Sequence, residues 1–495
     1  MKIHTFPSSG QGMHERRLHV MKFGGTSVGD AGCMRQVVEI VREASAGNAL
    51  VVVVSAMAGV TNQLLDVAEF AANGDYRRAL GILDQVRKKH YSTLHELISS
   101  GREGVEEQMQ ELFGLCVNWC ETARHSGLTP KLRASISSLG ERLSAPLIAA
   151  ALAELGVVSE AIEASEVLVT DNHFAAAEPL MELTRERCEA CLRPLLDKGV
   201  VPVVTGFLGA TVEGELTTLG RGGSDYSATI LGAVLAADEV TIWTDVEGIL
   251  TADPRLVPDA ATIPTISYQE AAELAYYGAK VLHPKTLRPV MQSGIPVWIR
   301  NTFAPKKAGT KIIPDGRKSA QSVKALAAVH DAALISLAAP AIDQIPNVFE
   351  RTLSAARSAR ADVLMMCHSH SCDRVCLVVA TASVEATVEA LRREFAPHSE
   401  ASDADHVSVD PSVAILTVVG QDLHQIRGIV GRAVDELSRG NVKILASAPG
   451  PSQCNISFVV PRKDLHTALI TTHQEFHSGP PNLAQDNNHS EALLS

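Results

Sequence analysis

The sequence predicts an α/β protein in which an open, mainly parallel sheet is sandwiched by helices and is followed by two smaller units of βαββ order. Three observations support this class. Strand-like runs alternate with helical periodicity from Leu18 to Asn301, as in proteins that build a parallel sheet. The run Val51–Val54 contains only valines, which is typical of a strand covered on both faces. After residue 323, the order strand, helix, strand, strand occurs twice.

The first half of the chain supplies the parallel sheet and its helices. Its strand-like runs are Leu18–Phe23, Ala49–Ser55, Val200–Phe207, Glu239–Asp245 and Pro296–Asn301. Apolar residues at helical spacing predict helices over Met34–Ser45, Asn62–Ala72, Tyr76–Ser99, Val105–His125, Glu141–Leu155 and Asp225–Ala236. We expect one domain over residues 18–305. Residues 1–17 lack periodicity, and we expect a disordered leader there.

The second half contains the repeated unit. A charged, turn-rich stretch predicts a linker over residues 306–322. The first unit, residues 323–397, is predicted to contain strands and helices over Lys324–Ala339, Phe349–Ser358, Asp362–Cys367, Arg374–Ala380 and Val384–Phe395. The second unit, residues 398–477, repeats this order over Ser412–Val419, Ile426–Ser438, Val442–Ala446, Asn455–Val460 and Lys463–Phe476. Two copies are too few for a solenoid, so they predict a paired ligand-sensing module. The polar residues 478–495 predict a disordered tail.

Composition excludes several classes of protein. The net charge of −12 argues against a nucleic-acid partner, because affinity for phosphate backbones depends on clustered cations. No apolar run reaches the ~20 residues that span a bilayer, and the N-terminus lacks the apolar region of a signal peptide. We therefore expect a cytoplasmic protein without membrane contact. Nine cysteines, an odd number, argue against a disulfide framework and favour a reducing compartment.

Two cysteine-containing patterns resemble metal sites. Cys188 and Cys191 lie in a helical stretch, and no second CxxC completes a tetrahedral set, so small semi-buried residues are the preferred interpretation. A second cluster lies between two strand-like runs and contains Cys367, His368, His370 and Cys372. Four ligands in one tight loop rarely reach one ion, and a polar hairpin loop is the preferred interpretation. We name no metal ligand from either pattern.

Loops rich in Gly, Ser, Thr and Asp follow the strands of the first half, where ligands bind in open α/β sheets. In the first loop, Lys22–Ser27, two glycines let backbone N–H groups approach an anion and the lysine adds a compact positive charge. The second, Thr218–Asp225, opens a helix whose free N–H groups favour anions, and its arginine can bind a carboxylate bidentately. Trp243–Gly248 and Gly278–Pro284 are the third and fourth loops. A tight turn, an N-cap and ordinary loops are the structural alternatives at these positions.

Taken together, the loops resemble one family. The motifs Lys22–Ser27, Ser55–Asn62, Gly140–Ser144, Gly220–Asp225, Trp243–Gly248, Ala252–Arg255 and Gly278–Pro284 occur in the order and spacing of aspartate kinase. The resemblance extends from Leu18 to about Val460. It implies an amino-acid-kinase fold followed by two ferredoxin-like ACT domains.

The resemblance also implies an activity. Enzymes of this family transfer the γ-phosphoryl group of ATP, with Mg²⁺, to the β-carboxylate of L-aspartate, giving 4-phospho-L-aspartate, the first step toward lysine, threonine and methionine. It implies feedback by an amino acid bound at the ACT domains, and a homodimer or higher homo-oligomer. A glutamate 5-kinase, an acetylglutamate kinase and a catalytically silent amino-acid sensor are the alternatives. We expect no fused homoserine dehydrogenase, because nothing after Val460 could form a dinucleotide domain.

Roles for individual residues follow from the same resemblance. Lys22 would hold the transferring phosphate and Asp225 would orient that lysine or the reacting groups, as the catalytic pair. Glu141 would meet the substrate ammonium and Arg221 its α-carboxylate. Further substrate-binding positions would be Thr26, Ser27, Ser55 and Ser224. Nucleotide and phosphates would be held by Lys22, Gly24, Gly25, Thr244, Asp245, Asp253, Arg255 and Lys280.

The chain departs from the family pattern in two places. Leu250 stands where the family usually has a tyrosine, which removes a ring contact near the nucleotide and leaves the chemistry intact. Residues 367–373 read Cys-His-Ser-His-Ser-Cys-Asp, where the family tends to have Gln followed by Ser-Ser-Glu. The identity of the effector is therefore left open.

Overall fold

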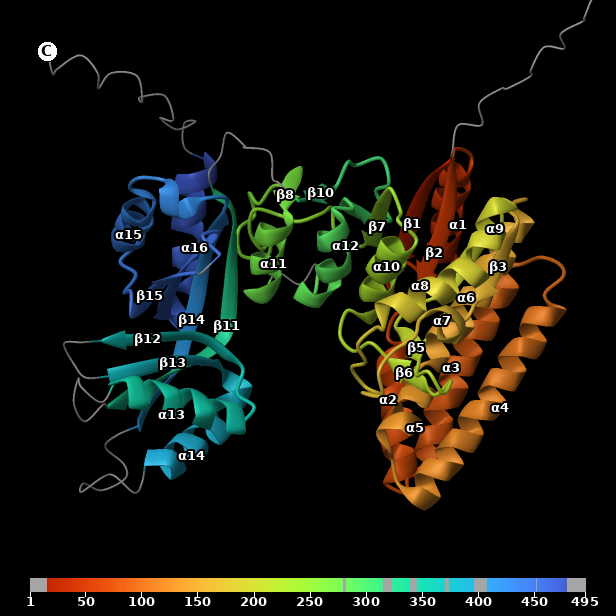
Figure 1. The fold of residues 1–495 in the computed structure, drawn as a ribbon, viewed down its shortest axis with the longest axis horizontal. Coiled ribbons are helices and arrows are strands. Elements are labelled where there is room, and N and C mark those ends of the chain that lie inside the picture. Colours follow the sequence, from red (N-terminus) through yellow and green to blue (C-terminus); the bar gives the residue numbers. More distant parts are fainter. Residues whose placement is uncertain are drawn as a thin grey trace, which may run out of the picture. The chain divides into compact units, whose positions relative to one another are not determined.

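The computed structural model describes residues 16–278, 282–314, 323–338, 345–369, 374–395, 407–450 and 452–478. Most of the expected tail and most of the expected leader therefore lie outside the described residues. The chain divides into two compact units (Figure 1). The first unit comprises Met1–Glu247 and Lys285–Ala308, and the second comprises Gly248–Pro284 and Gly309–Ser495. The segment between residues 248 and 284 thus leaves the first unit and folds with the second.

The first unit contains a parallel sheet, as predicted. Its strands run in the order β3-β4-β2-β1-β7-β9, and every neighbouring pair is parallel. These strands are β1 (Arg17–Phe23), β2 (Asn48–Val54), β3 (Ser159–Ile162), β4 (Val201–Thr205), β7 (Glu239–Thr244) and β9 (Val297–Asn301). The valines of Val51–Val54 are completely buried, which confirms a strand covered on both faces.

Helices cover both faces of this sheet. On one face, Phe23 and Val52 share a large apolar core with helices α1 (Ala31–Ser45), α2 (Val60–Ala72), α3 (Tyr76–Leu97), α4 (Glu103–Ser126) and α6 (Leu139–Glu154). The other face contacts α9 (Arg193–Asp197) and α10 (Gly223–Val234). The remaining helices of the unit are α5 (Pro130–Ser137), α7 (Ala164–Val167), α8 (Met181–Cys191) and α12 (Arg288–Ser293). Asp30 begins α1 by accepting a hydrogen bond from the Cys33 N–H at 2.8 Å, as an N-cap residue does.

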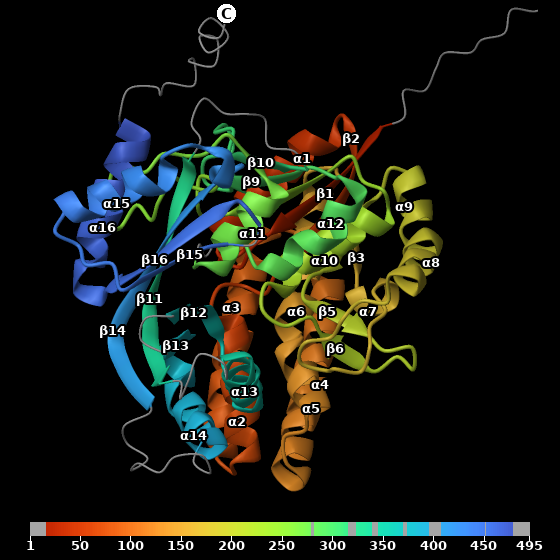
Figure 2. The same cartoon turned by 60° about the vertical axis from the view of Figure 1, so that its left-hand side comes forward.

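The second unit contains a six-stranded antiparallel sheet in the order β12-β13-β11-β14-β16-β15. Its two long strands, β11 (Val323–Ala338) and β14 (Val407–Gly420), lie side by side in both views (Figure 2). The shorter strands are β12 (Val363–Ser369), β13 (Arg374–Ala380), β15 (Ala446–Pro449) and β16 (Asn455–Pro461). The order strand, helix, strand, strand therefore occurs twice, as predicted.

Two apolar cores share the long strands of this sheet. One contains Leu326 and Leu416 with side chains of α15 (Ile429–Arg439) and α16 (Leu465–His473). The other contains Ile335 and Leu377 with side chains of α13 (Ile345–Ser358) and α14 (Val384–Phe395). Because β11 contributes to both cores, the two repeats form one continuous sheet.

The segment Gly248–Pro284 is hydrogen-bonded to this second unit. It contains β8 (Thr265–Ser267) and α11 (Tyr268–Tyr276), and β8 pairs in parallel with β10 (Thr310–Ile313). The Leu326 N–H donates to the Thr251 carbonyl at 2.8 Å, and the Gln269 side chain donates to the Ser452 carbonyl at 2.9 Å. Asn455 donates to Glu273 on α11. Residues 310–313, which we expected in a linker, are thus a paired strand.

One predicted strand was wrong. We expected a strand over Val442–Ala446, but β15 begins only at Ala446. The Val442 N–H donates to the Leu437 carbonyl at 2.8 Å, so this apolar residue closes the end of α15 instead of entering the sheet. Its side chain is buried in the core with Leu437. An apolar residue after a helix was therefore mistaken for the beginning of a strand.

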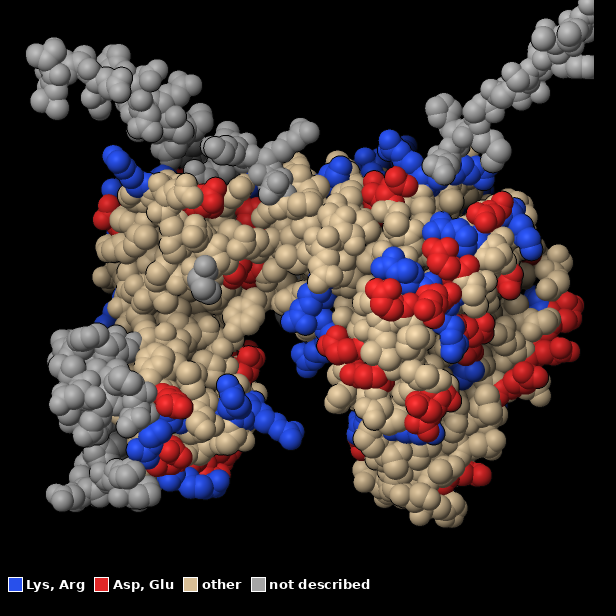
Figure 3. All heavy atoms as spheres, viewed as in Figure 1, with Lys and Arg blue, Asp and Glu red and all other residues tan. Residues whose placement is uncertain are grey.

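Two properties of the described residues concern possible partners: the distribution of charge on the surface, and the length and apolar character of the helices. On the face drawn in Figure 3, Lys and Arg side chains are interspersed with Asp and Glu side chains over the described residues. None of the described helices is long and apolar enough to cross a lipid bilayer.

Candidate active site

A pocket of about 560 Å³ opens in the first unit at the carboxyl ends of its strands. It is lined by loops that follow β1, β2 and β6 (Leu216–Thr218) and by the first turns of α6 and α10. The lining includes Lys22, Gly25, Ser55, Thr61, Asn62, Arg133, Ser137, Glu141, Phe207, Arg221, Ser224 and Asp225. Strand ends of a parallel sheet meet at one edge, which explains why loops far apart in the sequence converge here.

An ion pair between Lys22 and Asp225 lies in this pocket. The Lys22 Nζ atom is 2.5 Å from the Asp225 Oδ1 atom, and both side chains are largely buried. Lys22 stands near the end of β1, where neighbouring strands hold its backbone on both sides. Asp225 is in the first turn of α10, which begins after Gly222 at a positive φ of 67°. The positive end of this helix therefore faces the same space as the lysine.

The Lys22–Ser27 loop packs closely against the loop that follows β2. A Cβ atom on Gly25 would lie 2.9 Å from the Ala56 carbonyl oxygen, so no side chain fits there. A Cβ atom on Gly24 would lie 3.4 Å from the Lys22 Nζ atom. The Gly24 N–H donates to the Trp243 carbonyl at 3.1 Å, which fixes the loop against the end of β7. The two glycines thus leave open the space beside the lysine that a phosphate would occupy.

Glu141 is a completely buried carboxyl group in the wall of this pocket. Burial raises the pKa of Glu141 to about 8, although N–H groups of Ala56 and of Glu141 itself and the charge of Lys22 oppose the shift. Its Oε2 atom has no hydrogen-bond partner among the described residues. Gly140 allows this position, because a Cβ atom there would lie 2.5 Å from the Ala56 side chain. A buried carboxyl with a free oxygen is suited to bind a cationic group of a ligand.

The remaining predicted substrate residues divide into two groups. Arg221 is exposed at the pocket, and Ser55 and Ser224 also line it. Ser27 and Thr26 do not line it. Ser27 is buried and hydrogen-bonds the Thr302 hydroxyl at 2.7 Å, and Thr26 is exposed in the same turn.

The predicted nucleotide residues are spread over both units. Thr244 ends β7, and its hydroxyl donates to the exposed Asp245 carboxylate at 3.2 Å. Asp253 and Arg255 belong to the second unit and pair with each other, with Arg255 Nε 2.9 Å from Asp253 Oδ1. This pairing lowers the pKa of Asp253. Lys280 lies outside the described residues.

Several lining residues were not singled out from the sequence. Thr61 and Asn62 belong to the Ser55–Asn62 motif, so that motif could have predicted their place in the pocket. Arg133 forms an ion pair with Glu69 and gave no sequence signal. Phe207 has a positive φ of 70°, which is rare for a residue with a side chain, and its ring packs where a Cβ on Gly223 would lie.

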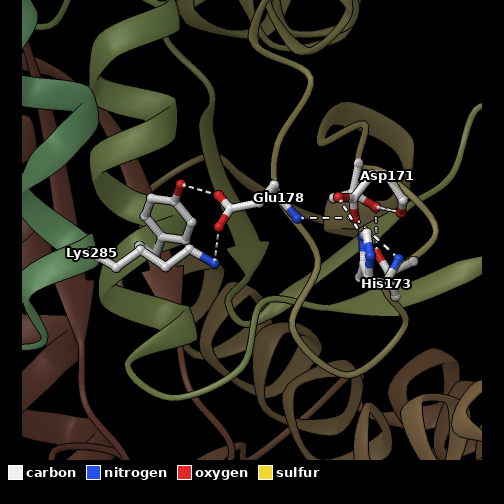
Figure 4. A network of polar contacts seen from close by, with 7 residues as sticks. Asp171, His173, Glu178 and Lys285 are labelled. Atoms are coloured by element: carbon white, nitrogen blue, oxygen red, sulfur yellow. Dashed lines mark hydrogen bonds and ion pairs between the residues drawn. The ribbon is translucent and has the colours of Figure 1, made fainter. Parts of the chain in front are cut away.

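A loop over residues 171–178 supports one wall of the pocket. The Phe174 carbonyl accepts from the Thr218 N–H at 2.8 Å, and Ala175 lines the pocket. Glu178 holds the far side of this loop, and Figure 4 shows Asp171 and Lys285 reaching Glu178 from opposite sides. The Glu178 N–H donates to Asp171 at 3.1 Å, and the Glu178 carboxylate accepts from Lys285 at 2.9 Å.

Glu178 also reaches the helix that carries Asp225. Its carboxylate accepts a hydrogen bond from the Tyr226 hydroxyl at 3.1 Å, and Tyr226 follows Asp225 directly in α10. The Lys285 Nζ atom lies 4.9 Å from the centre of the Tyr226 ring. Burial and the Glu178 carboxylate raise the pKa of Tyr226, so its hydroxyl remains a donor. The loop therefore connects the first turn of α10 with the residues after the Gly278–Pro284 motif.

The described residues offer no support for a metal at either of the two cysteine-containing patterns. Among the residues that the structure describes, no group of three or more His, Cys, Asp or Glu side chains could hold an ion. Cys188 is buried, and burial raises its pKa to about 12, so it remains a thiol. Of the Cys367, His368, His370 and Cys372 cluster, only the Cys367 side chain lies within the described residues.

Comparison with known proteins agrees with this geometry. The model of the amino acid kinase family matches residues 17–301, and that of the ACT domain matches residues 416–476. The lysine-sensitive aspartokinase 3 of Escherichia coli is 31% identical over 92% of this chain and 98% of its own length. The chain belongs to the aspartokinases, within the amino acid kinase family.

Solved aspartokinases share the fold. The crystal structure of E. coli aspartokinase III in complex with aspartate and ADP has a TM-score of 0.77 at 31% identity and covers 92% of this chain and 99% of that one. The aspartate kinase of Clostridium acetobutylicum also has a TM-score of 0.77, at 25% identity, over 92% of this chain and all of its own. The bifunctional aspartokinase/homoserine dehydrogenase of Haemophilus influenzae is 31% identical over 92% of this chain but only 56% of its own length. The aspartokinase chain therefore spans about half the length of such bifunctional relatives.

Proposed function

We propose that the chain transfers the γ-phosphoryl group of ATP to the β-carboxylate of L-aspartate and produces 4-phospho-L-aspartate. The observation that carries this proposal is a single pocket that combines a paired lysine, a buried carboxyl and an exposed arginine. An α-amino acid presents an ammonium and an α-carboxylate, which match Glu141 and Arg221 in charge. The second carboxylate of aspartate is then free to react.

The acceptor needs no general base in this reaction. A carboxyl group with a pKa of about 3.9 is already ionised at neutral pH, so the nucleophile exists before it binds. The obstacle is the repulsion between this anion and the phosphates. Catalysis therefore rests on positioning and on cations that stabilise the charge of an in-line transition state. Lys22 supplies the cation, and Asp225 fixes the direction in which its ammonium points.

The loops also suit a nucleotide. The Lys22–Ser27 loop offers backbone N–H groups and the open space beside two glycines, and Thr244 and Asp245 stand at the next strand end. Magnesium in such sites is held largely by phosphate oxygens together with one or two carboxylates, and Asp245 is an exposed carboxylate at this edge. When bound, Mg²⁺ neutralises part of the charge of the phosphates. Ser224, at the start of α10, would complete the donors around the substrates.

One assay tests the proposed reaction. The purified chain is supplied with Mg-ATP and L-aspartate, ADP release is followed, and hydroxylamine traps the acyl phosphate. We expect aspartate-dependent ADP and a hydroxamate product. L-glutamate and N-acetylglutamate serve as rival acceptors, and a higher kcat/KM for either one would overturn the choice of aspartate. ADP formation without dependence on any amino acid would overturn the proposal altogether.

We also propose that the second unit binds an amino-acid effector, lysine or threonine, and that the chain forms a homodimer or larger homo-oligomer. Support comes from its paired βαββ repeats and from the E. coli aspartokinase III structure in complex with lysine and aspartate, a relative 30% identical with a TM-score of 0.76. Coupling between such sites is typically about 1–3 kcal/mol. Titration of the kinase assay with lysine, threonine and both tests the effector. Unchanged activity and melting temperature at millimolar concentrations would refute it.

A further inference from the structure

Two free cysteines face each other across neighbouring strands of the second unit. Cys367 on β12 is paired directly with Cys376 on β13 in an antiparallel register. The two thiols are hydrogen-bonded to each other, and both residues are partly exposed. The Cys376 sulfur also lies 3.5 Å from the Ser336 hydroxyl on β11. The pair is therefore a fixed feature of the sheet.

The alternation of side chains places both sulfurs on the face away from the helices. Leu377 and Val375 point into the apolar core with α13 and α14, so Cys376 between them points to the opposite face. Residues directly opposed in an antiparallel pair share a face, which places Cys367 beside it. Figure 1 shows α13 and α14 on one side of β12 and β13. Small oxidants can therefore approach the thiols from the side that the helices leave open.

The spacing of opposed residues suits a disulfide. Their Cα atoms are about 4.5–5.5 Å apart in antiparallel sheets, within the range of about 4.4–6.8 Å that disulfides span. Their Cβ atoms lie about 4.5–5.5 Å apart, so an approach of about 1 Å would give the usual disulfide separation. β12 is an edge strand of the sheet, with β13 as its only neighbour among the strands described. The Tyr276 hydroxyl also donates to the Val363 carbonyl of β12 at 3.1 Å, four residues before Cys367, so the required movement is confined to the far end of this edge strand.

We propose that Cys367 and Cys376 form an oxidative modification site, at which a low-molecular-weight disulfide such as glutathione disulfide converts the two thiols into a cross-strand disulfide. The inference does not depend on the proposed phosphoryl transfer. The hydrogen bond with Cys376 and burial raise the pKa of Cys367, which disfavours its thiolate as the first attacking group.

The chemistry is a pair of thiol–disulfide exchanges. The Cys376 thiolate attacks one sulfur of glutathione disulfide, which forms a mixed disulfide and releases one glutathione thiolate. The Cys367 sulfur then attacks the Cys376 sulfur, forms the bond between the strands and releases the second glutathione. Each cysteine proton passes to a departing glutathione thiolate. The protein loses two electrons and two protons, and one glutathione disulfide becomes two molecules of glutathione.

Another cysteine pair and a single cysteine provide internal controls. Cys116 and Cys120 are four residues apart on α4 and completely buried, so an oxidant has no access to them. Cys33 is a half-buried single thiol in α1. Oxidation should therefore distinguish a paired, partly exposed site from thiols that are buried or single.

The test uses the full chain, glutathione disulfide in excess, alkylation of the remaining thiols and peptide mass spectrometry. We expect a cross-linked peptide that contains Cys367 and Cys376, about 2 Da lighter than the sum of its parts and restored by reduction. Cys372→Ser and Cys33→Ser should form it as the wild type does. Cys376→Ser should not, and only the proteins that form the cross-link should gain melting temperature on oxidation, since a native cross-link constrains the unfolded chain.

Four results would overturn the proposal. Cys367 and Cys376 could both remain alkylatable after prolonged oxidation. Cys367 could instead be linked to Cys372, in which case the cross-link disappears in Cys372→Ser. The bond could join two copies of the chain, which a non-reducing gel would show as a covalent dimer. Mixed disulfides with glutathione that persist on both cysteines would also contradict closure of the pair.

Discussion

Glu141 predicts how the affinity for aspartate depends on pH. Burial raises the pKa of its carboxyl to about 8, so most molecules with an empty pocket hold it protonated at pH 7. A protonated carboxyl cannot pair with the substrate ammonium. With a pKa of about 8, its ionised fraction is about 0.1 at pH 7 and about 0.75 at pH 8.5. We therefore expect the KM for aspartate to fall about 8-fold over this interval.

The assay measures initial rates of ADP release against aspartate concentration at fixed, saturating Mg-ATP. The KM for ATP, measured in the same buffers, is the internal control and should change little. Glu141→Gln keeps the size of the side chain and removes the charge, so its KM for aspartate should be high and independent of pH. Calorimetry in buffers of different ionisation enthalpy should show that wild type releases about 0.9 proton per aspartate at pH 7.

The same group predicts a change in stability. The pKa in the folded protein, about 8, is above the ordinary value of 4.5, so folding becomes less favourable as pH rises between these values. At pH 7 the buried carboxyl costs about 3 kcal/mol relative to its ionised state in the unfolded chain. Glu141→Gln should therefore gain stability over wild type as pH rises from 5 to 8. A KM that is independent of pH in wild type, or the same slope in both proteins, would refute this reasoning.

Three further predictions concern the pocket and its support. Lys22→Met and Asp225→Ala should lower kcat at least about 100-fold with unchanged melting curves, since they remove the cation and its orienting partner; near wild-type turnover would disprove the assigned roles. Gly25→Ala should lower kcat/KM about 10-fold or more, because its Cβ would lie 2.9 Å from the Ala56 carbonyl oxygen. As the control, Gly81→Ala should leave the kinetics unchanged, because a Cβ atom there meets no atom within 4 Å. Glu178→Gln should raise the KM for aspartate about 2- to 5-fold, because it weakens the contacts of Glu178 with Tyr226 on α10 and with Lys285. Glu182→Gln, at an exposed position, should leave this KM unchanged. Equal effects of the two substitutions would contradict the proposed support of α10.

Much of the fold follows from local patterns. The valines of Val51–Val54 predicted a doubly covered strand, because no position along that run can face water. β3 and the hairpin of β5 (Leu208–Ala210) and β6 (Leu216–Thr218) were not predicted, since three or four residues carry too little periodicity. β8 and β10 pair across a long stretch of sequence, and no local pattern indicates that pairing.

The candidate site was predictable where it depends on strand ends. Lys22 and Asp225 lie far apart in the sequence and were expected to meet, because parallel strands present their carboxyl ends on one edge. Glu141 was expected beside them only from the resemblance to aspartate kinase. The left-handed backbone of Phe207 and the hydrogen bonds of Glu178 depend on tertiary packing and were not expected. The roles of the lining residues remain predictions for the assays above.

Residues 248–284 place two of the residues matched to nucleotide binding in the second unit. Asp253 and Arg255, matched to nucleotide binding, stand on a stretch of chain whose hydrogen bonds run to β11, to Ser452 and to β16. Glu141 and Arg221, matched to the ammonium and α-carboxylate of aspartate, stand in the first unit. If Asp253 and Arg255 hold the nucleotide, as the resemblance implies, an amino acid that rearranges the antiparallel sheet would alter the affinity for ATP. Inhibition of this kind would be relieved by raising ATP.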